Sequence, residues 1–288
     1  MRGAVCLVTG ATGGIGYETA LGLARLGARV AIVGRDPGKL QACADRIRAA
    51  VPGAAVEPHR ADLSAQAEIR RLAGTLRAAY PRLDVLVNNA GAIFDRRTLT
   101  VDGIERTWAL DHLGYVLLTL ELLDPLKDAA AAGGKPRIVN VASAAHYRGH
   151  IDFDDVEGAR RYRAMGAYAQ AKLANVLFTY ALARRLRDSG ITANAVHPGV
   201  VNTGFAKNTG GLLGAAWALM RPLLITPEKG ARTSLHVASD PGLDGVTGRY
   251  FSHGRPKVSS AESRDEAVQE RLWTLSLRQV GRSDRGGR

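Results

Sequence analysis

The chain has 288 residues, of which 46% are hydrophobic and 23% charged, which suits one large globular domain or two small ones. Its two cysteines supply neither a disulfide framework nor metal-ligand spacing, so those classes of protein are excluded. The formal net charge of +12 favours anionic ligands, but the arginines are scattered along expected helices without aromatic interleaving, which argues against a nucleic-acid-binding protein.

Short apolar runs of strand length alternate with amphipathic helical patterns along the chain. We expect strands at residues 5–8, 30–33, 56–59, 85–87, 138–141 and 191–196. We expect helices at residues 16–26, 37–50, 65–79, 101–122, 164–187 and 228–239. Such alternation is typical of a parallel sheet covered on both faces. The sequence therefore predicts an α/β fold with a single doubly wound (Rossmann) domain over residues 1–281, built on a six- to seven-stranded parallel sheet.

The remaining segments predict accessory features. No secretory signal precedes the first expected strand, and the longest apolar stretch is too short to span a bilayer, so we expect a cytoplasmic protein without a transmembrane segment. The apolar segment 205–225 is expected to cover a substrate as a lid; a helix pair packed on the body, or a surface for a subunit or membrane, is the alternative. Residues 282–288 are expected to form a disordered basic tail.

A glycine-rich segment follows the first expected strand and opens the first expected helix. Glycines at such a point allow positive φ angles and close approach of the backbone to a phosphate, which the helix N-terminus attracts. A tight turn without a ligand is the alternative, but the strand–loop–helix context favours a dinucleotide site. The candidate residues for cofactor binding here are Gly10, Thr12, Gly13, Gly14, Ile15 and Gly16.

The residue after the second expected strand indicates which dinucleotide would bind. Gly34 and Arg35 stand where an acidic residue would bond the ribose diol, and Asp36 comes one position too late for that role. A guanidinium can make a bidentate pair with a 2′-phosphate. The sequence therefore predicts NADP as the cofactor, with a solvated loop arginine as the alternative.

The next two strand ends carry further candidate contacts to the cofactor. Asp62, followed by Leu63, would accept a hydrogen bond from the adenine amino group, or cap the helix expected near residue 65, or both. Asn89, Ala90 and Gly91 close the fourth expected strand, where small residues let a cofactor lie against the sheet and amides bond backbone or ribose. A plain turn is the alternative for this segment.

Tyr168 and Lys172 are four residues apart in an expected helix and therefore share one face of it. A phenol with a pKa of about 10 transfers protons poorly at neutral pH. A cation within about 4–6 Å favours the phenolate and lowers that pKa. Alone, the pair is weak evidence and favours a core tyrosine beside a solvated lysine, so a catalytic meaning depends on the other motifs.

Taken in order, these motifs resemble the short-chain dehydrogenase/reductase family. The matching stretches are residues 9–16, 62–63, 88–91, 143, 168 with 172, and 197–203. Within the family the chain is most similar to the retinol dehydrogenase-like and WW-domain oxidoreductase-like branch. Residues 111–114, 138–146, 172–178 and 248–251 support that resemblance, which extends from about residue 4 to residue 281.

The resemblance implies an oxidoreductase that interconverts a carbonyl and an alcohol. Ser143 would bond the carbonyl oxygen, although a strand-terminal cap is its alternative role. Tyr168 would donate or accept the proton, and Lys172 would hold the nicotinamide ribose and favour the tyrosinate. The carboxamide end of the cofactor would be framed by Pro198, Gly199, Val201 and Thr203.

Asp111 departs from the family pattern, which usually has asparagine there to support a water that links the lysine to solvent. A carboxylate lacks the N–H donor, and its charge can pair with Lys172 or disturb the proton relay. The alternative is that the carboxylate accepts the same water bond and nothing changes. Asp111 is therefore a fourth catalytic candidate.

The sequence thus predicts an NADP(H)-dependent oxidoreductase for a lipophilic or aromatic small molecule, as a possible homodimer or homotetramer. Because of Asp111, two alternatives stay open. One is a repurposed fold that performs epimerisation, elimination or cyclisation around a retained cofactor. The other is a regulatory protein that binds NADP without turnover.

Overall fold

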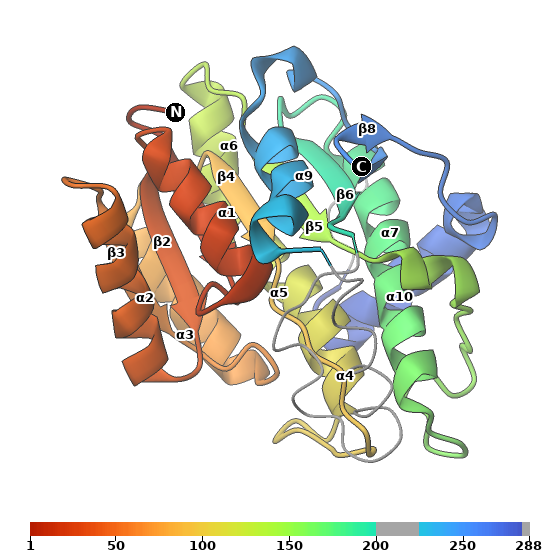
Figure 1. Ribbon diagram of the computed structural model, residues 1–288. Helices are drawn as coiled ribbons and strands as arrows, with labels where there is room; N and C mark the ends of the chain where they lie inside the picture. Colours follow the sequence, from red (N-terminus) through yellow and green to blue (C-terminus); the bar gives the residue numbers. More distant parts are fainter. Residues whose placement is uncertain (200–224, 284–288) are drawn as a thin grey trace.

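The computed structural model describes residues 1–199 and 225–283, and its centre is one twisted sheet (Figure 1). Among these residues the sheet has eight strands in the order β3-β2-β1-β4-β5-β6-β7-β8. The first seven run parallel, and β8 pairs antiparallel with β7. The strands are β1 (Val5–Thr9), β2 (Arg29–Gly34), β3 (Val56–Arg60), β4 (Val85–Asn88), β5 (Arg137–Val141), β6 (Thr192–His197), β7 (Tyr250–Ser252) and β8 (Arg255–Pro256).

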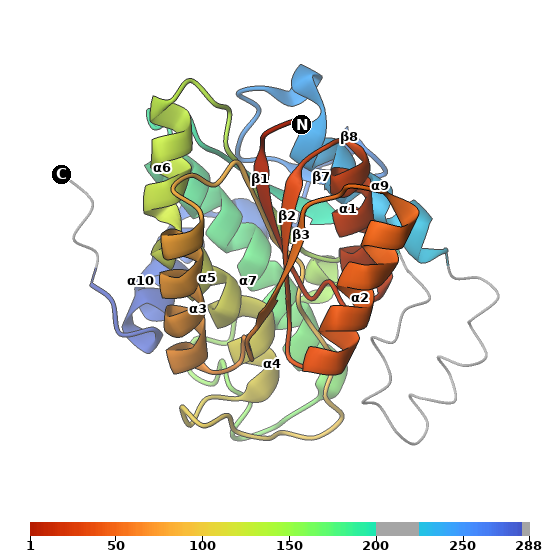
Figure 2. The same ribbon diagram turned by 90° about the vertical axis from the view of Figure 1, so that its left-hand side faces the viewer.

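Helices cover both faces of the sheet (Figure 2). One face carries α1 (Gly14–Arg25), α2 (Pro37–Ala50) and α9 (Pro227–Ser239). The other carries α3 (Gln66–Ala79), α4 (Arg106–Trp108), α5 (Gly114–Glu121), α6 (Leu123–Ala131), α7 (Ala164–Arg185) and α10 (Glu266–Gln279). The predicted single doubly wound domain is confirmed.

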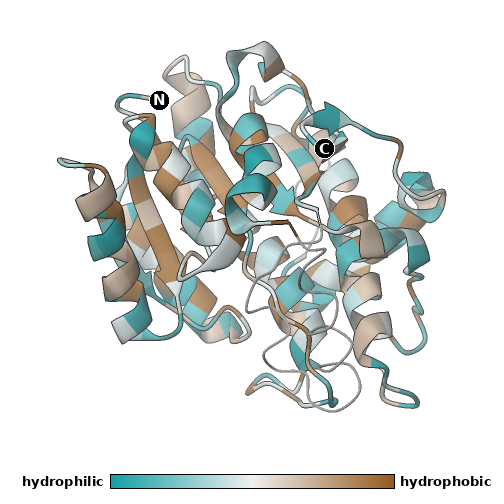
Figure 3. Cartoon of the chain, in the orientation of Figure 1, coloured by the Kyte–Doolittle hydropathy of each residue, from teal (hydrophilic) through white to brown (hydrophobic). Residues whose placement is uncertain are grey.

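The inner strands of the sheet are mostly apolar (Figure 3) because both of their faces are buried, whereas β3 and β8 at the two edges are polar and more exposed. Neighbouring residues of β1 illustrate the alternation: Leu7 packs in the cluster beneath α3 and α7, whereas Cys6 and Val8 pack beneath α1 and α2. All three side chains are fully buried. The continuous apolar runs in the sequence are therefore the signature of a two-sided core.

The chain reverses its direction of growth between β1 and β4. From β1 it builds outward to β2 and β3, and it then returns to place β4 on the other side of β1. In open α/β sheets such a reversal leaves a crevice at the carboxyl ends of the strands, where ligands bind. The glycine-rich segment after β1 and the Asn-Asn-Ala-Gly segment after β4 both lie at this edge.

Several elements differ from those expected. The strands β7 and β8 and the helices α6 and α10 are additions, because short strands and helices buried by tertiary packing have weak patterns of their own. The helix expected at 101–122 begins only at Arg106, since a bridge between Leu99 and Glu105 closes a turn before it. The Glu105 carboxylate then accepts the N–H groups of Thr107 and Trp108 and caps the helix.

A π-helical turn, Ala109–Leu113, separates α4 from α5. Such turns inside α-helices frequently occur at functional sites. This one contains Asp111, and the next residue, His112, bonds Asn175 of α7 and Ser276 of α10. The turn therefore ties three helices together around the candidate site.

The predicted accessory segments are placed only in part. Of the lid expected at 205–225, only Ile225 lies within the described residues, and residues 284–288 of the expected tail lie outside them. The guanidinium of Arg282, the first residue of the expected tail, pairs with Glu121 at 2.8 Å. Among the helices that the structure describes, none has the length and apolarity needed to cross a membrane.

Candidate active site

Thr9, at the end of β1, joins the two loops of the crevice. Its hydroxyl accepts the N–H groups of Asn89 and Ala90 over 2.8 and 3.0 Å and contacts the Val87 carbonyl at 3.3 Å. The Asn89 amide donates to the Thr9 carbonyl over 2.8 Å and contacts the Gly10 carbonyl at 3.4 Å. The predicted bonding of the amide to backbone is confirmed, whereas Thr9 itself was not among the predicted site residues.

The glycines after β1 are required by close contacts. Gly10 has a φ of +66°, and an added Cβ would lie 2.7 Å from the Ala90 Cα atom. A Cβ at Gly16 would lie 2.4 Å from the Gly10 carbonyl oxygen. Gly13 differs, because nothing among the described atoms lies within 4 Å of the position its Cβ would take. A loop packed tightly on itself but open at Gly13, at the start of α1, fits the phosphates of a dinucleotide.

Arg35 and Asp36 follow β2 with different roles. Asp36 is the N-cap of α2: its carboxylate accepts the Lys39 N–H over 3.1 Å and lies 3.4 Å from the Lys39 ammonium. The Lys39 N–H lowers the pKa of Asp36, as expected for a capping carboxylate. Arg35 is exposed and forms no ion pair within residues 1–199 and 225–283. Asp36 is thus engaged in the helix cap, and Arg35 is available.

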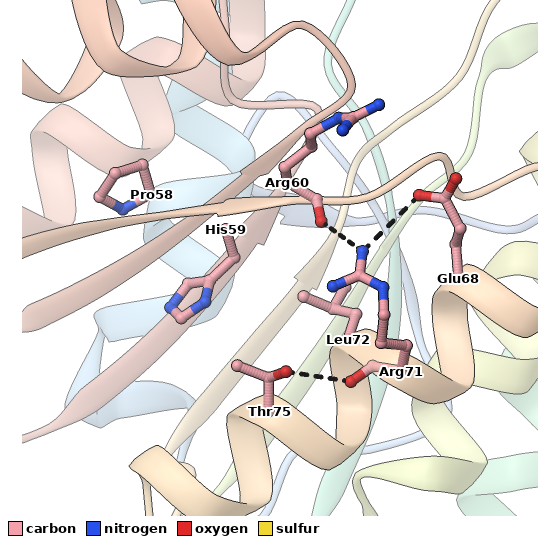
Figure 4. A pocket seen from close by; sticks show the side chains of 7 residues that line it. All are labelled: Pro58, His59, Arg60, Glu68, Arg71, Leu72 and Thr75. Carbon is pink, nitrogen blue, oxygen red and sulfur yellow. Dashed lines mark hydrogen bonds and ion pairs between the residues drawn. The ribbon is translucent and has the colours of Figure 1, made fainter.

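A groove of about 410 Å³ lies along the edge strand β3 and α3 (Figure 4), and neither Ser143 nor Tyr168 is among its lining residues. Within it, Arg71 donates to the Arg60 carbonyl and lies 3.7 Å from Glu68. The Arg60 side chain points away from both (Figure 4). Because Arg60 pairs in register with Gly34, this second exposed arginine leaves the sheet beside the position of Arg35.

The sequence allowed Asp62 to cap α3, but the structure shows no such cap. Its carboxylate accepts the N–H and the hydroxyl of Ser64, which closes a local turn, and α3 begins at Gln66. The Gln66 N–H is instead accepted by Asp102, which lies 36 positions later in the chain. Leu63 is buried in the core. Sequence proximity could not reveal a cap supplied from such a distance.

Three of the four catalytic candidates, Tyr168, Lys172 and Asp111, are buried together. The Lys172 ammonium lies 3.1 Å from Oδ2 of Asp111, and these side chains are 3% and 0% exposed. Its nitrogen is 5.5 Å from the centre of the Tyr168 ring. The Ser143 side chain interacts with the Tyr168 hydroxyl and acts to lower its pKa, although burial outweighs this effect and raises it. The structure therefore brings all four candidates into one cluster.

The position of Asp111 is fixed by its backbone and side chain together. Oδ1 accepts the N–H of Ala92 over 2.9 Å, and the main-chain carbonyl accepts the Asn175 amide over 2.8 Å. Burial raises the pKa of the carboxyl, while Lys172 opposes that rise. A Cβ at Gly91 would lie 2.9 Å from Oδ2 and 3.1 Å from the Lys172 nitrogen. Glycine at position 91 thus leaves room for this pair.

The turn that contains Ser143 is held by two histidines. His197, at the end of β6, accepts the Ala144 N–H at Nδ1 over 3.2 Å. His146 Nδ1 lies 2.7 Å from the Ser143 carbonyl, while Nε2 accepts the Ser260 N–H over 3.2 Å, so Nδ1 carries the proton. Ser143 itself caps the turn by accepting the Ala145 N–H. The cap predicted as its alternative role is therefore also present.

An apolar cluster adjoins Tyr168 on the outer side of the site. It contains Ile93 and Ala164, with Ala145 and Tyr162 packed against it. The Tyr162 hydroxyl donates to the Phe94 carbonyl over 2.9 Å, which joins the loop after β4 to the loop before α7. The phenol ring is therefore packed against hydrocarbon side chains, and Ile93 and Ala164 are themselves buried.

The last predicted contacts lie after β6. Gly199 has a φ of +91°, which favours glycine, and an added Cβ would lie 2.5 Å from the Ile225 side chain. Pro198 is half-buried beside it, while Val201 and Thr203 lie outside the described residues. No group of His, Cys, Asp and Glu side chains suited to a metal ion occurs in the described part of the chain.

Comparisons with known proteins agree with this arrangement. Retinol dehydrogenase 12 of Mus musculus is 42% identical over 97% of this chain and 87% of its own length. Polyprenol dehydrogenase of Homo sapiens is 39% identical over 96% of this chain and 85% of its own. An uncharacterized protein from Mycobacterium paratuberculosis has a similar structure, with a TM-score of 0.79 and 32% identity over 98% of this chain and 95% of that one.

A second solved structure is the active-site complex of Pseudomonas aeruginosa RhlG with NADP. It matches with a TM-score of 0.70 and 28% identity over 93% of this chain and 97% of that chain. The family model described as short chain dehydrogenase matches residues 4–211. The chain therefore belongs to the short-chain dehydrogenase family, in its retinol dehydrogenase-like part, and is an oxidoreductase that acts on alcohol or carbonyl groups with a nicotinamide cofactor.

Proposed function

We propose that this protein interconverts a carbonyl and an alcohol on a lipophilic small molecule, with NADP(H) as cofactor and Tyr168 as the proton-transfer group. The observation that carries the proposal is the buried cluster in which the Lys172 ammonium lies 5.5 Å from the centre of the Tyr168 ring and the Ser143 side chain interacts with the Tyr168 phenol. Two neutral donors that meet at one point can both bond a carbonyl oxygen as negative charge develops on it.

The chemistry requires little movement of protein groups. When bound, the nicotinamide supplies the hydride that bonds to the carbonyl carbon. Ser143 stabilises the developing charge on the oxygen, and Tyr168 gives that oxygen its proton, which completes the alcohol. In the reverse direction the Tyr168 phenolate takes the proton from the alcohol. Lys172 would hold the ribose of the cofactor beside the phenol.

NADP is favoured over NAD by charge at the end of β2. Asp36, which would be the nearest acid for a ribose diol, is engaged in the cap of α2. Arg35 and Arg60 are both exposed at this edge of the sheet, where a 2′-phosphate would need cationic partners. The open space at Gly13 would accept the pyrophosphate.

The lipophilic substrate is supported by the apolar cluster of Ile93 and Ala164 beside Tyr168. Two relatives, which are named for retinol and polyprenol, act on alcohols with long hydrocarbon parts. A retinoid or a prenyl aldehyde is therefore a suitable first probe. A sugar would find few polar partners against this surface.

The direct test measures NADPH oxidation with retinal, a prenyl aldehyde and a panel of aromatic and aliphatic ketones. Tyr168→Phe should lower kcat/KM by several orders of magnitude, because the proton donor is lost while the ring remains. Tyr180→Phe is the matched control: it lies on the same helix, but its hydroxyl bonds Ser259. An active Tyr168→Phe enzyme would show that another group transfers the proton.

A further inference from the structure

Asp111 and Lys172 form an ion pair directly behind the Tyr168 phenol. The ammonium nitrogen of Lys172 lies 3.1 Å from Oδ2 of Asp111. The Lys172 side chain is 3% exposed and the Asp111 side chain 0%. The same nitrogen contacts the Val141 carbonyl at 3.4 Å and lies 5.5 Å from the centre of the Tyr168 ring. The Lys172 ammonium therefore forms its ion pair with the Asp111 carboxylate and is farther from the Tyr168 ring.

The pair alters what Lys172 can do to the phenol. An ammonium alone stabilises a neighbouring phenolate. A carboxylate in contact with that ammonium offsets most of its field, because opposite charges largely cancel at distances beyond their own separation. The offset holds whichever member keeps the shared proton, since carboxylate with ammonium and carboxylic acid with amine both have zero net charge.

The other described groups that face Tyr168 do not replace the lost cation. Tyr115 of α5 and Tyr250 of β7 are phenols whose ionisation would oppose that of Tyr168. Ser143, after β5, offers a neutral hydroxyl. Burial is the main cause that raises the pKa of Tyr168; the interaction with Ser143 opposes the rise, and the charge of Asp111 adds a smaller increase.

We propose that Asp111 holds Lys172 in a neutral pair so that Tyr168 stays a protonated phenol at neutral pH, which sets this site for carbonyl reduction. The inference rests on the proposed role of Tyr168 in proton transfer. During reduction the carbonyl carbon gains the hydride of the reduced cofactor, the oxygen gains the Tyr168 proton, and the phenolate regains a proton from solvent. Asp111 acts through Lys172 and is a positioning residue.

The opposite direction has a different requirement. Alcohol oxidation needs the phenolate to accept a proton, so its rate depends on the small ionised fraction of Tyr168. That rate should rise about tenfold per pH unit below the midpoint of the Tyr168 titration. A family member with asparagine at this position would lack the carboxylate, so its lysine would favour the phenolate that alcohol oxidation needs.

The experiment titrates Tyr168 in the protein without cofactor or substrate, by 13C NMR of tyrosine labelled at Cζ. Tyr168→Phe identifies the signal among the eight tyrosines. In the wild type the signal should remain that of a phenol up to about pH 10. Asp111→Asn should lower the midpoint by about one to three pH units, because the ammonium is then uncompensated.

A double variant separates charge from packing. Asp111→Asn combined with Lys172→Met removes both charges and should return the Tyr168 midpoint to that of the wild type. A wild-type midpoint near neutrality would overturn the proposal. The proposal would also be overturned if the Tyr168 midpoint of Asp111→Asn equalled that of the wild type. This includes the case in which Lys172, without its carboxylate partner, loses its proton and so gives no net charge beside the phenol.

Kinetics of the unaltered enzyme provide a second measurement in case Asp111→Asn does not fold. Between about pH 6 and pH 9, kcat for carbonyl reduction should be nearly constant while kcat for alcohol oxidation rises. An oxidation rate already at its plateau near pH 7 would contradict the proposal. The NMR titration needs no turnover, so an absence of Tyr168-dependent NADPH oxidation would refute the proposed function separately from this result.

Discussion

The main-chain N–H of Ala144 donates to Nδ1 of His197 over 3.2 Å, which joins the turn after β5 to the end of β6. The acceptor is a neutral imidazole, because burial lowers the pKa of His197 to about 4. The neighbouring turn contains Ser143, whose placement depends on this contact. The protonation state of one histidine is therefore linked to both stability and the geometry of the site.

The first prediction concerns acid stability. In the unfolded chain His197 titrates near its ordinary pKa of about 6.5, whereas the folded value is about 4. As the pH falls from about 6.5 to 4, the unfolded chain therefore binds the proton first, and the folded state loses about 3 kcal/mol at most. Urea denaturation at several pH values measures this loss. His197→Asn should show a shallower pH dependence, and an unchanged slope would exclude His197 as the cause.

The second prediction separates the two residues after β2. Arg35→Ala should weaken NADPH binding about 10- to 100-fold, as expected for the loss of a charge-assisted bond to phosphate, and leave NADH binding nearly unchanged. Asp36→Ala should lower the melting temperature through loss of the α2 cap without changing the preference for NADPH. Fluorescence titration and thermal denaturation of both variants supply the comparison. Equal weakening of NADPH and NADH by Arg35→Ala would refute the preference for NADP.

The third prediction uses two glycines of one loop. Gly16→Ala would place a Cβ 2.4 Å from the Gly10 carbonyl oxygen, so the protein should be destabilised. Gly13 has an extended φ of 176°, and its Cβ would enter open space. Gly13→Ala should therefore keep its melting temperature while it loses cofactor affinity. If Gly13→Ala bound NADPH as the wild type does, the pyrophosphate would have to lie elsewhere.

The fourth prediction concerns Thr9. Thr9→Val keeps the shape of the side chain but leaves the N–H groups of Asn89 and Ala90 without their acceptor. We expect a loss of about 2–6 kcal/mol in the free energy of unfolding, from about 1–3 kcal/mol for each of the two unpaired groups, toward the lower end because both residues are half-buried. Thr9→Ser retains the hydroxyl and should lose much less. Comparable losses in the two variants would assign the effect to the methyl group.

The fold class could be predicted from the sequence because the patterns that indicate it are local. The apolar strands, the loop from Gly10 to Gly16 and the spacing of Tyr168 and Lys172 can each be found within a few neighbouring residues. The contacts between distant segments could not be predicted in the same way. Asp102 capping α3 and His146 binding Ser260 depend on tertiary packing, which gives no local pattern.

Short helices and strands are likewise difficult to predict from local sequence patterns. Strand β8 has two residues, and α10 contacts the π-helical turn through Ser276, which bonds His112. Asp111 was identified from its departure from a family pattern, but its direct contact with Lys172 required the structure. The candidate residues and the possible pairing of Asp111 with Lys172 could thus be predicted from sequence, while the contacts that hold them in place could not.

The π-helical turn at Ala109–Leu113 makes chain length a determinant of the site. In an α-helix each residue advances the direction of its side chain by about 100°. Deleting one residue from this turn would restore α-helical winding and rotate Asp111 relative to α5 by about that angle. Over this short stretch, insertions and deletions should be tolerated far less than substitutions, since the number of residues between the Glu105 cap and α5 determines which side chain meets Lys172.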